Sequence, residues 1–394
     1  MKYLFVVKGY YPNVNGGSQR SVQMLSEGLV RQGDSVYVLC LDAENEKKVY
    51  SHNGVIVISV PIRNIYLPKA GVKKSFLAKT LWHLIDVFNV WAVIEFYFIA
   101  KKISPDVVNT NTIEGFSTGL FSVPKLIGAK LVHTLRDYYL ICPRSGMYKN
   151  NKNCETVCTE CKLLTFNNKR MMRNVDLVLG NSDFIIDCHL QHDVFGQEAA
   201  FVKQLNIMHS GVIEKNQVKK SGNYVFGAIG RLNKLKGMHI VVNAFKDRED
   251  TLLLAGGGDS DFIGELSANL NINSKFLGWC DPIDFYSKID FLICPSLYHD
   301  PLPRVVYEAY SYGVPVIAAD SGGTPEMIEE GITGFLYRFD SPDELKNCIN
   351  NALKMSETDY INMRNNCMEY SKRHAESPVI LAYKENISRL FVGH

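Results

Sequence analysis

Two basic side chains, Arg231 and Lys236, directly follow an apolar strand predicted over residues 224–229. An arginine fork together with a lysine ammonium suits the two phosphates of a nucleoside diphosphate. Basic residues are common at strand ends, so this pair alone is not specific. It becomes informative only in combination with the acidic residues of the same half of the chain.

Two acidic residues, Asp300 and Glu308, lie in a predicted βαβ unit that spans residues 290–326. In this unit an apolar strand (291–294) is followed by a proline-rich loop, a helix (304–312) and a second apolar strand. Ligands of such sheets bind outside the carboxyl ends of the strands, where both acids are expected. Glu308 can reach a ribose diol, and N–H groups at the start of the helix can bind a phosphate. The alternative for Glu308 is a solvated helix residue.

The whole chain alternates between predicted strands and helices. At 394 residues and 46% apolar content it exceeds the roughly 250–300 residues at which a single core stops growing. The expected fold class is α/β, with two Rossmann-like βαβ domains that face each other across a cleft. The predicted parts are an N-terminal domain (1–213), a polar linker (214–222), a C-terminal domain (223–375) and a C-terminal helix that packs back on the N-terminal domain (376–394).

Gly16 and Gly17 lie between a buried strand predicted over residues 2–7 and a helix that begins near residue 18. Backbone N–H groups at such a turn can approach a phosphate or a sugar ring. Many strand-to-helix turns contain two glycines for purely conformational reasons, so this signal is weak by itself.

Several enzyme classes are disfavoured by motifs that the chain lacks. The first turn reads NVNGGSQ, without the GxGxxG spacing of hydride-transferring enzymes. No GxxxxGK[ST] sequence occurs, and no HExxH pair of histidines on a helix suggests a metal hydrolase. A dehydrogenase or a nucleoside triphosphatase is therefore not expected.

Four cysteines, Cys142, Cys154, Cys158 and Cys161, follow the pattern C-x11-C-x3-C-x2-C. Four thiolates can close tetrahedrally on zinc, and one pair has the CxxC spacing of a zinc knuckle. The alternative is four free structural thiols, as expected in a reducing compartment. A structural zinc ion is thus a hypothesis that metal analysis of the purified protein would decide.

Residues 47–85 contain seven Lys or Arg and no acidic residue, with aromatic and aliphatic residues interleaved. This pattern is typical of an amphipathic segment at an anionic membrane surface. The adjoining apolar run, 84–100, is too short and too charged to span a bilayer. The alternative is a solvated loop followed by a buried helix.

The compartment and partners follow from composition. The apolar start MKYLFVV leads into polar PNVNGG without a cleavage site, so no signal peptide is expected and the protein is predicted to be cytoplasmic. The net charge is +2, with an excess of basic residues in the first 200 positions, so that half is expected to meet something anionic. Nucleic acid is not an expected partner.

Taken together, these motifs resemble the family-four nucleotide-sugar glycosyltransferases of GT-B fold. The resemblance covers most of the chain, is strongest over 224–336 and is weakest over 45–105. The motifs that carry it are the Gly16-Gly17 turn, VDLVLGNS (175–182), HSG (209–211), Gly230-Arg231-Leu232 with Lys236-Gly237, FLGW (276–279), DPLPRVVYEA (300–309), GVPVIA (313–318) and GGTPE (322–326).

The resemblance implies roles for individual residues. Arg231 and Lys236 would hold the donor diphosphate, Glu308 the ribose hydroxyls, and Gly16-Gly17 would close over the donor. Gly278 and Trp279 would lie beside the base. The backbone amides of four successive residues would hold the transferred sugar and the phosphate: Leu302, Pro303, Arg304 and Val305. Members of this family retain the anomeric configuration and need no metal or other cofactor for the transfer.

Two departures from the family pattern stand out. The first acid of the E-x7-E motif is Asp300, one methylene shorter, which puts the donor sugar preference in doubt. Many relatives have His-Asp after the strand KLVHTL, where this chain has Arg136-Asp137. Strand alternation places His133 and Arg136 on opposite faces, so His133 cannot simply replace the missing histidine. Either Arg136 acts as the cation near the developing charge or that role is absent, and His133 is then a core imidazole.

The expected function is a retaining glycosyltransferase at the inner face of the cytoplasmic membrane. Its expected donor is a nucleotide-diphosphate sugar, a UDP-sugar before a GDP-sugar. Its expected acceptor is a lipid-linked saccharide, carried on undecaprenyl diphosphate, in O-antigen, capsule or exopolysaccharide assembly. A non-catalytic nucleotide-sugar-binding or regulatory protein is the alternative, and a sugar-nucleotide epimerase is disfavoured by the Arg231–Lys236 motif.

Overall fold

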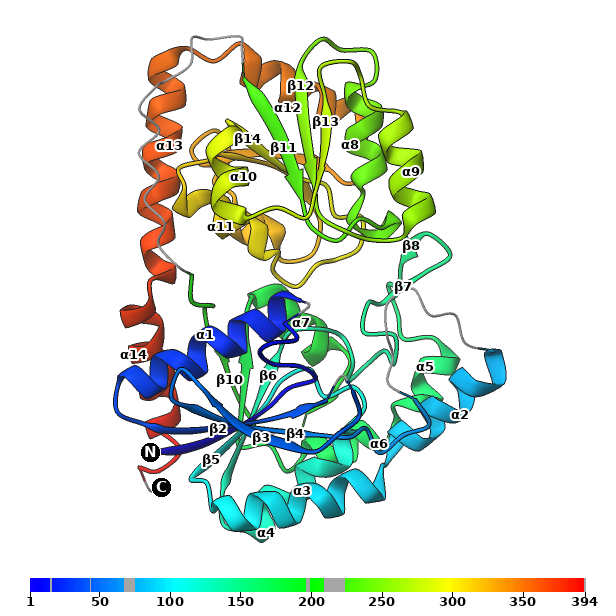
Figure 1. The fold of residues 1–394 in the computed structure, drawn as a ribbon, viewed down its shortest axis with the longest axis vertical. Coiled ribbons are helices and arrows are strands. Elements are labelled where there is room, and N and C mark those ends of the chain that lie inside the picture. The colour runs from blue at the N-terminus through cyan, green and yellow to red at the C-terminus, as the bar shows by residue number, and fades with distance from the viewer. Residues whose placement is uncertain (15, 43, 67–74, 196–198, 209–223, 393–394) are drawn as a thin grey trace. The chain divides into compact units, whose positions relative to one another are not determined.

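The computed structural model describes residues 1–14, 16–42, 44–66, 75–195, 199–208 and 224–392. The chain divides into two compact units (Figure 1). Unit 1 contains Met1–Met147, Cys154–Ile207 and Glu376–His394, and unit 2 contains Tyr148–Asn153 and Met208–Ala375. The linker predicted at 214–222 and the HSG motif at 209–211 lie outside the described residues.

Unit 1 is built on a sheet of order β10-β9-β6-β5-β1-β2-β4-β3, in which β3 pairs antiparallel with β4 and the other described pairs are parallel. Its strands are β1 (Lys2–Val6), β2 (Ser35–Leu41), β3 (Lys48–His52), β4 (Val55–Val60), β5 (Val107–Thr110), β6 (Lys130–Leu135), β9 (Leu177–Gly180) and β10 (Ala200–Lys203). Its helices are α1 (Gly17–Arg31), α2 (Phe76–Val87), α3 (Val90–Ile103), α4 (Val123–Leu126), α5 (Thr159–Leu164), α6 (Phe166–Met172), α7 (Asp183–Gln191) and α14 (Glu376–Ser388), with a 3₁₀ turn at Thr118–Ser122.

The two faces of this sheet form separate cores because side chains alternate along each strand. In β1, Leu4 and Val6 face a core that includes Phe96 of α3. Tyr3 and Phe5 face the other core, to which α1 and α14 contribute. Each strand therefore positions a helix layer on both sides of the sheet.

The C-terminal helix α14 belongs to unit 1. Tyr383 packs in the same core as Tyr3 and Phe5, and its hydroxyl accepts a hydrogen bond from Asn109 Nδ2 at 2.9 Å. Glu376 pairs with Arg31 on α1, and the Nε–Oε1 distance is 2.8 Å. The last helix is thus tied to the first one by apolar packing and an ion pair.

Unit 2 has a sheet of order β13-β12-β11-β14-β15-β16, whose described pairs are all parallel. Its strands are β11 (Val225–Ile229), β12 (Thr251–Ala255), β13 (Lys275–Gly278), β14 (Phe291–Cys294), β15 (Val316–Asp320) and β16 (Gly334–Arg338), and a separate hairpin joins β7 (Tyr148–Lys149) to β8 (Lys152–Asn153). Its helices are α8 (Met238–Phe245), α9 (Ser260–Ala268), α10 (Pro282–Lys288), α11 (Arg304–Ser311), α12 (Pro342–Leu353) and α13 (Glu357–Ser371), with 3₁₀ turns at Lys234–Lys236, Thr324–Met327 and Lys372–His374. Helices α8, α9 and α12 pack on one face of this sheet, and α10 and α11 pack on the other.

The apolar run at 84–100 forms parts of two helices rather than one. Phe88 is extended (φ −154°), which ends α2, and the side chain of Asn89 caps α3 by accepting from Ala92 N at 3.1 Å. The amide of Asn89 also donates to the Arg63 carbonyl at 2.7 Å, so the break is anchored to the loop after β4. The polar Asn89 therefore acts as a helix boundary inside an otherwise apolar sequence.

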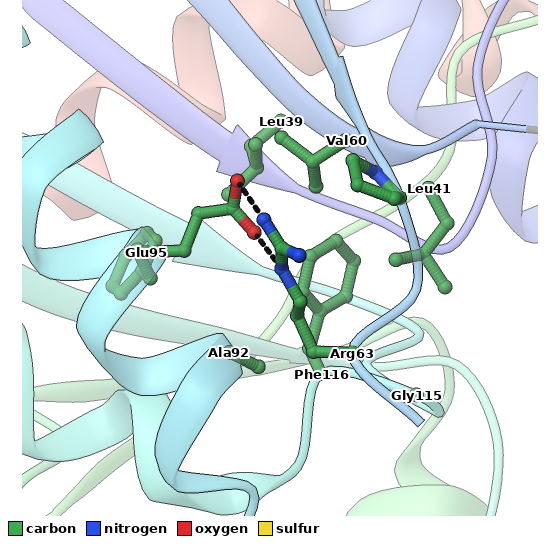
Figure 2. A pocket seen from close by; sticks show the side chains of 10 residues that line it. Leu39, Leu41, Val60, Arg63, Ala92, Glu95, Gly115 and Phe116 are labelled. Atoms are coloured by element: carbon green, nitrogen blue, oxygen red, sulfur yellow. Dashed lines mark hydrogen bonds and ion pairs between the residues drawn. The ribbon is translucent and has the colours of Figure 1, made fainter. Parts of the chain in front are cut away.

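Three of the seven basic residues in the segment predicted at 47–85, Lys47, Lys48 and Arg63, pair with acids outside that window. Lys48 pairs with Glu44 at 2.5 Å and with Glu46 at 3.1 Å. Arg63 forms a two-pronged pair with Glu95 at 2.8 and 3.1 Å (Figure 2). The strands β3 and β4 take up the first part of the segment, and residues 67–74 lie outside the described part. Lys47, Lys48 and Arg63 are thus paired with acids, and contact of the 47–85 segment with an anionic membrane stays a prediction.

Candidate active site

The site expected from the sequence lies where the sheet of unit 2 changes winding direction. From β11 the chain winds outward through β12 to β13, whereas β14 begins the opposite course through β15 to β16. The loops after β11 and β14 therefore diverge, and such a switch point leaves a crevice at the carboxyl ends of the two strands. Lys236 comes from the first loop and Asp300 from the second.

Lys236 and Asp300 form an ion pair between Nζ and Oδ2. The side chains are 28% and 10% exposed, respectively. The Lys236 Nζ also lies 3.4 Å from the Tyr298 hydroxyl oxygen and 4.9 Å from the centroid of that ring. Burial opposes the charge on Lys236, but the Asp300 carboxylate outweighs it and raises the pKa of Lys236. The crevice thus holds a fixed ammonium at neutral pH.

The loop that carries Lys236 is held by its own polar groups and by a glycine. Asn233 Oδ1 accepts from the Lys236 amide at 3.0 Å, and the Leu297 amide donates to the Leu235 carbonyl at 2.9 Å. Gly237 has φ +69°, and a Cβ there would lie 1.9 Å from the Pro295 carbonyl oxygen. This close approach brings the two loops together and requires glycine.

The turn after β15 holds the loop around Asp300. Ser321 Oγ donates to the Tyr298 carbonyl at 3.0 Å, and the Gly323 amide donates to the Asp300 carbonyl at 2.9 Å. Gly322 has φ +63°, and a Cβ there would lie 2.3 Å from the Asp300 carbonyl oxygen. The glycine-rich turn therefore acts as a backbone support for the acidic residue.

Glu308 is held on α11 by two donors. Its Oε1 accepts from Arg304 Nε at 3.2 Å, one helical turn earlier, and its Oε2 accepts from the Tyr286 hydroxyl at 3.5 Å. The helix begins after Pro303, whose side chain has no acceptor to cap it. The first N–H groups of α11, at Arg304 and Val305, are half-buried, and Leu302 and Pro303 are buried. The helix thus carries both an oriented carboxylate, which suits a ribose diol, and an N-terminus, which suits a phosphate.

The remaining predicted residues of unit 2 follow the strands next to the switch point. Arg231 is exposed just after β11, five residues before Lys236. Gly278 ends β13 with φ +68° and accepts from the Gly256 amide at 2.8 Å. Trp279 is 85% exposed, and a Cβ on Gly257 would lie 2.3 Å from its Nε1. The indole therefore presents a large open surface beside the carboxyl ends of β12 and β13.

The predicted residues of unit 1 lie at the carboxyl ends of its own strands. Gly16 precedes α1, whose first residue, Gly17, is exposed. Arg136 follows β6, and its guanidinium donates from Nε to Asn111 Oδ1 at 2.8 Å and from Nη1 to Asn206 Oδ1. These two hydrogen bonds fix the orientation of the Arg136 guanidinium and use two of its nitrogens, Nε and Nη1.

His133 is a buried core imidazole. Its Nδ1 lies 2.8 Å from Thr110 Oγ1 on the neighbouring strand, and its ring packs edge-on against Phe121. Burial lowers the pKa of His133 to about 3, so the ring is neutral at physiological pH. The departure from the family pattern at Arg136 is therefore not offset by His133.

A group of charged residues at the same edge of unit 1 was missed by the sequence analysis. Lys8, after β1, pairs with Glu114, after β5, at 2.5 Å. Tyr139 donates its hydroxyl to Asp86 Oδ2, and the Gly115 amide donates to Asp86 Oδ1 at 3.1 Å. Burial raises the pKa of Asp86 to about 7. The sequence signal that could have indicated this pair is that Lys8 and Glu114 follow shortly after β1 and β5, which are neighbours in the sheet.

The four predicted zinc ligands do not assemble into a metal site. Cys142 is buried, and its Sγ lies 3.8 Å from the Sγ of Cys161. Cys154 and Cys161 pack against the apolar core of unit 1. Within the described residues, which include Cys158 and the other three cysteines, no group of three or more His, Cys, Asp or Glu is arranged to hold a metal ion. Cys161 contacts both Cys142 and Cys158, and the structural zinc ion stays a prediction that metal analysis of the purified protein would decide.

Asn153 of the β7–β8 hairpin contacts the proline-rich loop through both ends of its amide. Its Nδ2 donates to the Leu297 carbonyl at 2.8 Å, and its Oδ1 accepts from the His299 amide at 3.0 Å. This hairpin belongs to unit 2, although the domain boundary predicted from the sequence places it in the N-terminal domain, and Asn153 was not among the predicted site residues. The amide thus holds the backbone of the residues that immediately precede Asp300.

We expect Asn153→Ala to lower kcat/KM for the donor about 10-fold, because two hydrogen bonds of roughly 0.5–1.5 kcal/mol each are lost. Steady-state kinetics with varied donor would measure this. Lys152→Ala, an exposed change in the same hairpin, is the control and should be silent. Equal kinetics for Asn153→Ala and the wild type would contradict the positioning role.

A hollow in unit 1 lies away from these residues, between β2, β4 and α3 (Figure 2). Its walls include Leu39, Leu41 and Val60, with the Arg63–Glu95 pair at its rim. It encloses about 240 Å³ including its open mouth, below the roughly 300–1,000 Å³ of typical ligand sites. This hollow is a packing feature rather than the candidate site.

Comparison with known proteins agrees with the geometry at the switch point. The sequence model described as "Glycosyl transferases group 1" matches residues 211–374, and "Glycosyl transferase 4-like domain" matches residues 16–200. An uncharacterised 42.6 kDa protein in the cps region of Klebsiella pneumoniae is 32% identical over 328 residues, 83% of this chain and 87% of that protein. The chain is a family-four glycosyltransferase.

Further relatives of this glycosyltransferase extend over most of its length. The putative glycosyltransferase YtcC of Bacillus subtilis (strain 168) is 23% identical over 390 residues, 93% of this chain and 85% of that protein. Sucrose-phosphate synthase from Thermosynechococcus elongatus has the same fold, with a TM-score of 0.78, 19% identity and 99% of each chain covered. Anabaena HepE, solved in complex with UDP-glucose, has a TM-score of 0.71 and 20% identity over 99% of this chain and 100% of that chain. The GT-B fold expected from the sequence is thereby confirmed.

Proposed function

We propose that this glycosyltransferase moves a sugar from a UDP-sugar to a hydroxyl of a lipid-linked saccharide, with retention of anomeric configuration. The observation that carries the donor part is the Lys236–Asp300 pair at the switch point, next to the open N-terminus of α11. The relative from a Klebsiella cps region and the UDP-glucose complex of HepE support a role in surface polysaccharide assembly with a uridine nucleotide.

The chemistry follows from where charge develops. As the glycosidic bond to the donor breaks, negative charge builds up on the leaving diphosphate. The Lys236 ammonium, the Arg231 guanidinium and the first N–H groups of α11 would stabilise that charge. Glu308, oriented by Arg304 and Tyr286, would accept hydrogen bonds from the ribose diol. These groups bind the leaving group more tightly as the reaction proceeds.

Retention requires the acceptor hydroxyl to attack the face from which the diphosphate departs. A phosphate oxygen of the leaving group can then take the proton of the attacking hydroxyl. This arrangement needs no separate protein base, which is consistent with Asp300 being engaged by Lys236. We propose that the acceptor is carried on a polyprenyl diphosphate and that the enzyme works at the inner face of the cytoplasmic membrane.

A donor screen tests this proposal. We expect one UDP-sugar to raise the Tm of the wild type by about 5–10 °C at 100 times its Kd, since such saturation adds roughly 2.7 kcal/mol. GDP- and dTDP-sugars at the same concentration should have smaller effects. With the best donor and a lipid-linked acceptor, NMR coupling constants of the product should show the donor's anomeric configuration.

Two outcomes would argue against the proposal. Binding of a nucleotide sugar without hydrolysis or transfer across the panel would support a non-catalytic, regulatory protein of the same fold. A product of inverted configuration would remove the same-face mechanism while leaving the donor assignment intact.

A further inference from the structure

Helices α2 and α3 of unit 1 carry large apolar side chains on the surface of the molecule. On α2 these are Phe76, Leu77, Leu81 and Leu84, and on α3 they are Val90, Trp91, Ile94 and Phe98. Each is between 42% and 79% exposed. We call this set the α2–α3 face.

The area of the α2–α3 face exceeds what an unpartnered surface normally shows. Its three most open aromatic residues, Phe76, Trp91 and Phe98, are 66–79% exposed. At 150–250 Å² per aromatic side chain they alone expose on the order of 400 Å² of apolar surface. The largest apolar patch of a typical monomer measures roughly 300–600 Å², so the aliphatic residues take this face beyond that size.

The exposed residues form one stripe on each helix, opposite a stripe that is buried. Leu77, Leu81 and Leu84 recur every three or four positions, as residues on one helical face do. The opposite side of α2 buries Trp82, whose Nε1 donates to the Tyr66 carbonyl at 2.8 Å. On α3, the opposite side buries Phe96 and Ile99 in the core of unit 1. The helices are thus fixed to the sheet, and their apolar outer sides are left over after folding.

The charges on the two helices favour an anionic partner. Asp86 is buried, and Glu95 is paired with Arg63, so the acids of these helices are turned inward. Lys79, Lys101 and Lys102 are exposed on the same two helices. By helical spacing Lys101 and Lys102 lie on the exposed side of α3, whereas Lys79 lies on the side of α2 that carries Trp82. The outer surface therefore combines an apolar stripe with cationic residues at its α3 end, which is the pattern of a helix that lies at an anionic membrane surface.

A neighbouring helix pair extends the same surface. Helix α5 lies next to α2, and α6 follows α5 directly in the chain (Figure 1). Leu163 on α5 and Phe166 on α6 are both exposed. Basic residues accompany them at Lys162 and Arg170, whereas Lys169 is paired with Asp193. Apolar and cationic side chains therefore alternate across this part of unit 1.

Among the described residues, no single helix is long and apolar enough to cross a membrane. The pair α2 and α3 reaches the required length and composition only together, with a bend of 44° between them. Because Trp82, Phe96 and Ile99 are packed in the core of unit 1, a crossing by this pair would expose that core. The geometry suits helices that lie along a membrane surface.

We propose that the α2–α3 face inserts into the interfacial region of a bilayer that contains anionic lipid. Trp91 would lie at the level of the headgroups, with Phe98 and Leu84 reaching the acyl chains and Lys101 and Lys102 meeting the lipid phosphates. This assignment rests on the part of the proposed function that places the enzyme at a membrane. Because Lys47, Lys48 and Arg63 are paired with acids, it places the contact at the α2 end of the segment predicted over 47–85 and adds α3 to it.

Vesicle flotation of the full chain tests this assignment without any measurement of turnover. The wild type should float with vesicles of phosphatidylcholine and phosphatidylglycerol in equal parts, and less with phosphatidylcholine alone. Trp91→Glu/Phe98→Glu should lower the partition coefficient by at least about 100-fold. Leu381→Glu, at an exposed position of α14, and Ile272→Glu, at an exposed position of unit 2, should float like the wild type.

A separate variant tests whether the exposed lysines contribute to binding of anionic lipid. Lys101→Glu/Lys102→Glu should lower binding to the anionic vesicles by at least about 25-fold, since each lysine near an anionic leaflet contributes about five-fold. Its residual binding to phosphatidylcholine should equal that of the wild type. An equal loss on both kinds of vesicle would overturn the role of anionic lipid.

Fluorescence locates the contact. The chain has three tryptophans, of which Trp82 is buried and Trp279 lies in unit 2 at the donor site. Lipids brominated near the headgroup should quench the wild type on vesicles, and Trp91→Phe should abolish that quenching while still floating. Quenching that persists in Trp91→Phe would place the contact elsewhere.

The rival occupant of the face is a second copy of the chain. A dimer in analytical ultracentrifugation that Trp91→Glu dissociates, with no flotation of the wild type, would overturn the lipid assignment. Because the donor thermal shift is measured without vesicles, loss of flotation with an intact UDP-sugar shift would refute only the membrane contact. Loss of the shift with intact flotation would refute only the proposed donor.

Discussion

Lys236→Ala is expected to lower kcat for sugar transfer by about 100-fold or more, equivalent to roughly 2.7 kcal/mol of transition-state stabilisation. The ammonium is held between the loops after β11 and β14, and the second loop leads into α11, whose N-terminus no side chain caps. Charge on the leaving diphosphate grows as the donor bond breaks, so the loss should fall on kcat more than on KM. Steady-state kinetics with the donor identified by thermal shift would measure it.

The same change removes the partner of Asp300, so loss of folding has to be separated from loss of chemistry. An unpaired, largely buried carboxylate costs roughly 3 kcal/mol of stability. The double variant Lys236→Ala/Asp300→Asn removes both charges and should recover most of the Tm but not the activity. Lys234→Ala, an exposed lysine of the same loop, is the matched control and should keep wild-type turnover. Recovery of activity in the double variant would show that Lys236 acts only through stability.

Gly322→Ala is expected to destabilise unit 2 by about 2–5 kcal/mol, because two penalties combine. The backbone has φ +63°, which disfavours any residue with a Cβ, and that Cβ would lie 2.3 Å from the Asp300 carbonyl oxygen and 2.7 Å from the Asp300 nitrogen. Both neighbours are backbone atoms and cannot rotate away. Thermal unfolding should show a decrease of about 5–15 °C in the transition of unit 2.

Activity should fall together with stability in this variant, since the turn is hydrogen-bonded to the loop that carries Asp300. Gly264→Ala is the control, because Gly264 is exposed on α9 and a Cβ there meets nothing within 4 Å. It should leave activity unchanged and slightly raise the Tm, as alanine is the better helix former. A Gly322→Ala protein with the wild-type Tm would contradict the close approach of the two loops.

Much of unit 2 could be predicted because its elements are short apolar runs bounded by glycine and proline. Pro295 directly follows the strand at Phe291–Cys294, and Gly256 directly follows the strand at Thr251–Ala255. The helix at Pro342–Leu353 begins with proline at its first position, which favours helix starts. Such local signals depend on a few adjacent residues, so no tertiary information was needed to place these elements.

Contacts between distant residues could not be predicted in the same way. Lys236 and Asp300 were each expected in the site, but their ion pair depends on β11 and β14 being neighbours in the sheet. The hydrogen bonds of Asn153 to the proline-rich loop span about 145 positions and leave no periodic trace. Likewise, the cysteines over 142–161 have a spacing that zinc sites use, but the core of unit 1 takes up three of their side chains.

By itself the sequence determined the α/β class, the family resemblance and the residue types at the carboxyl ends of β11 and β14. These are properties of local runs and motifs, which do not depend on residues that are distant in the sequence. Only the tertiary structure decided which charges are neutralised: Glu95 folds onto Arg63, and Asp300 pairs with Lys236. It also decided which side of the apolar helices α2 and α3 is left exposed. Burial and pairing depend on what the rest of the chain brings to a residue, so they cannot be read from its neighbours in sequence.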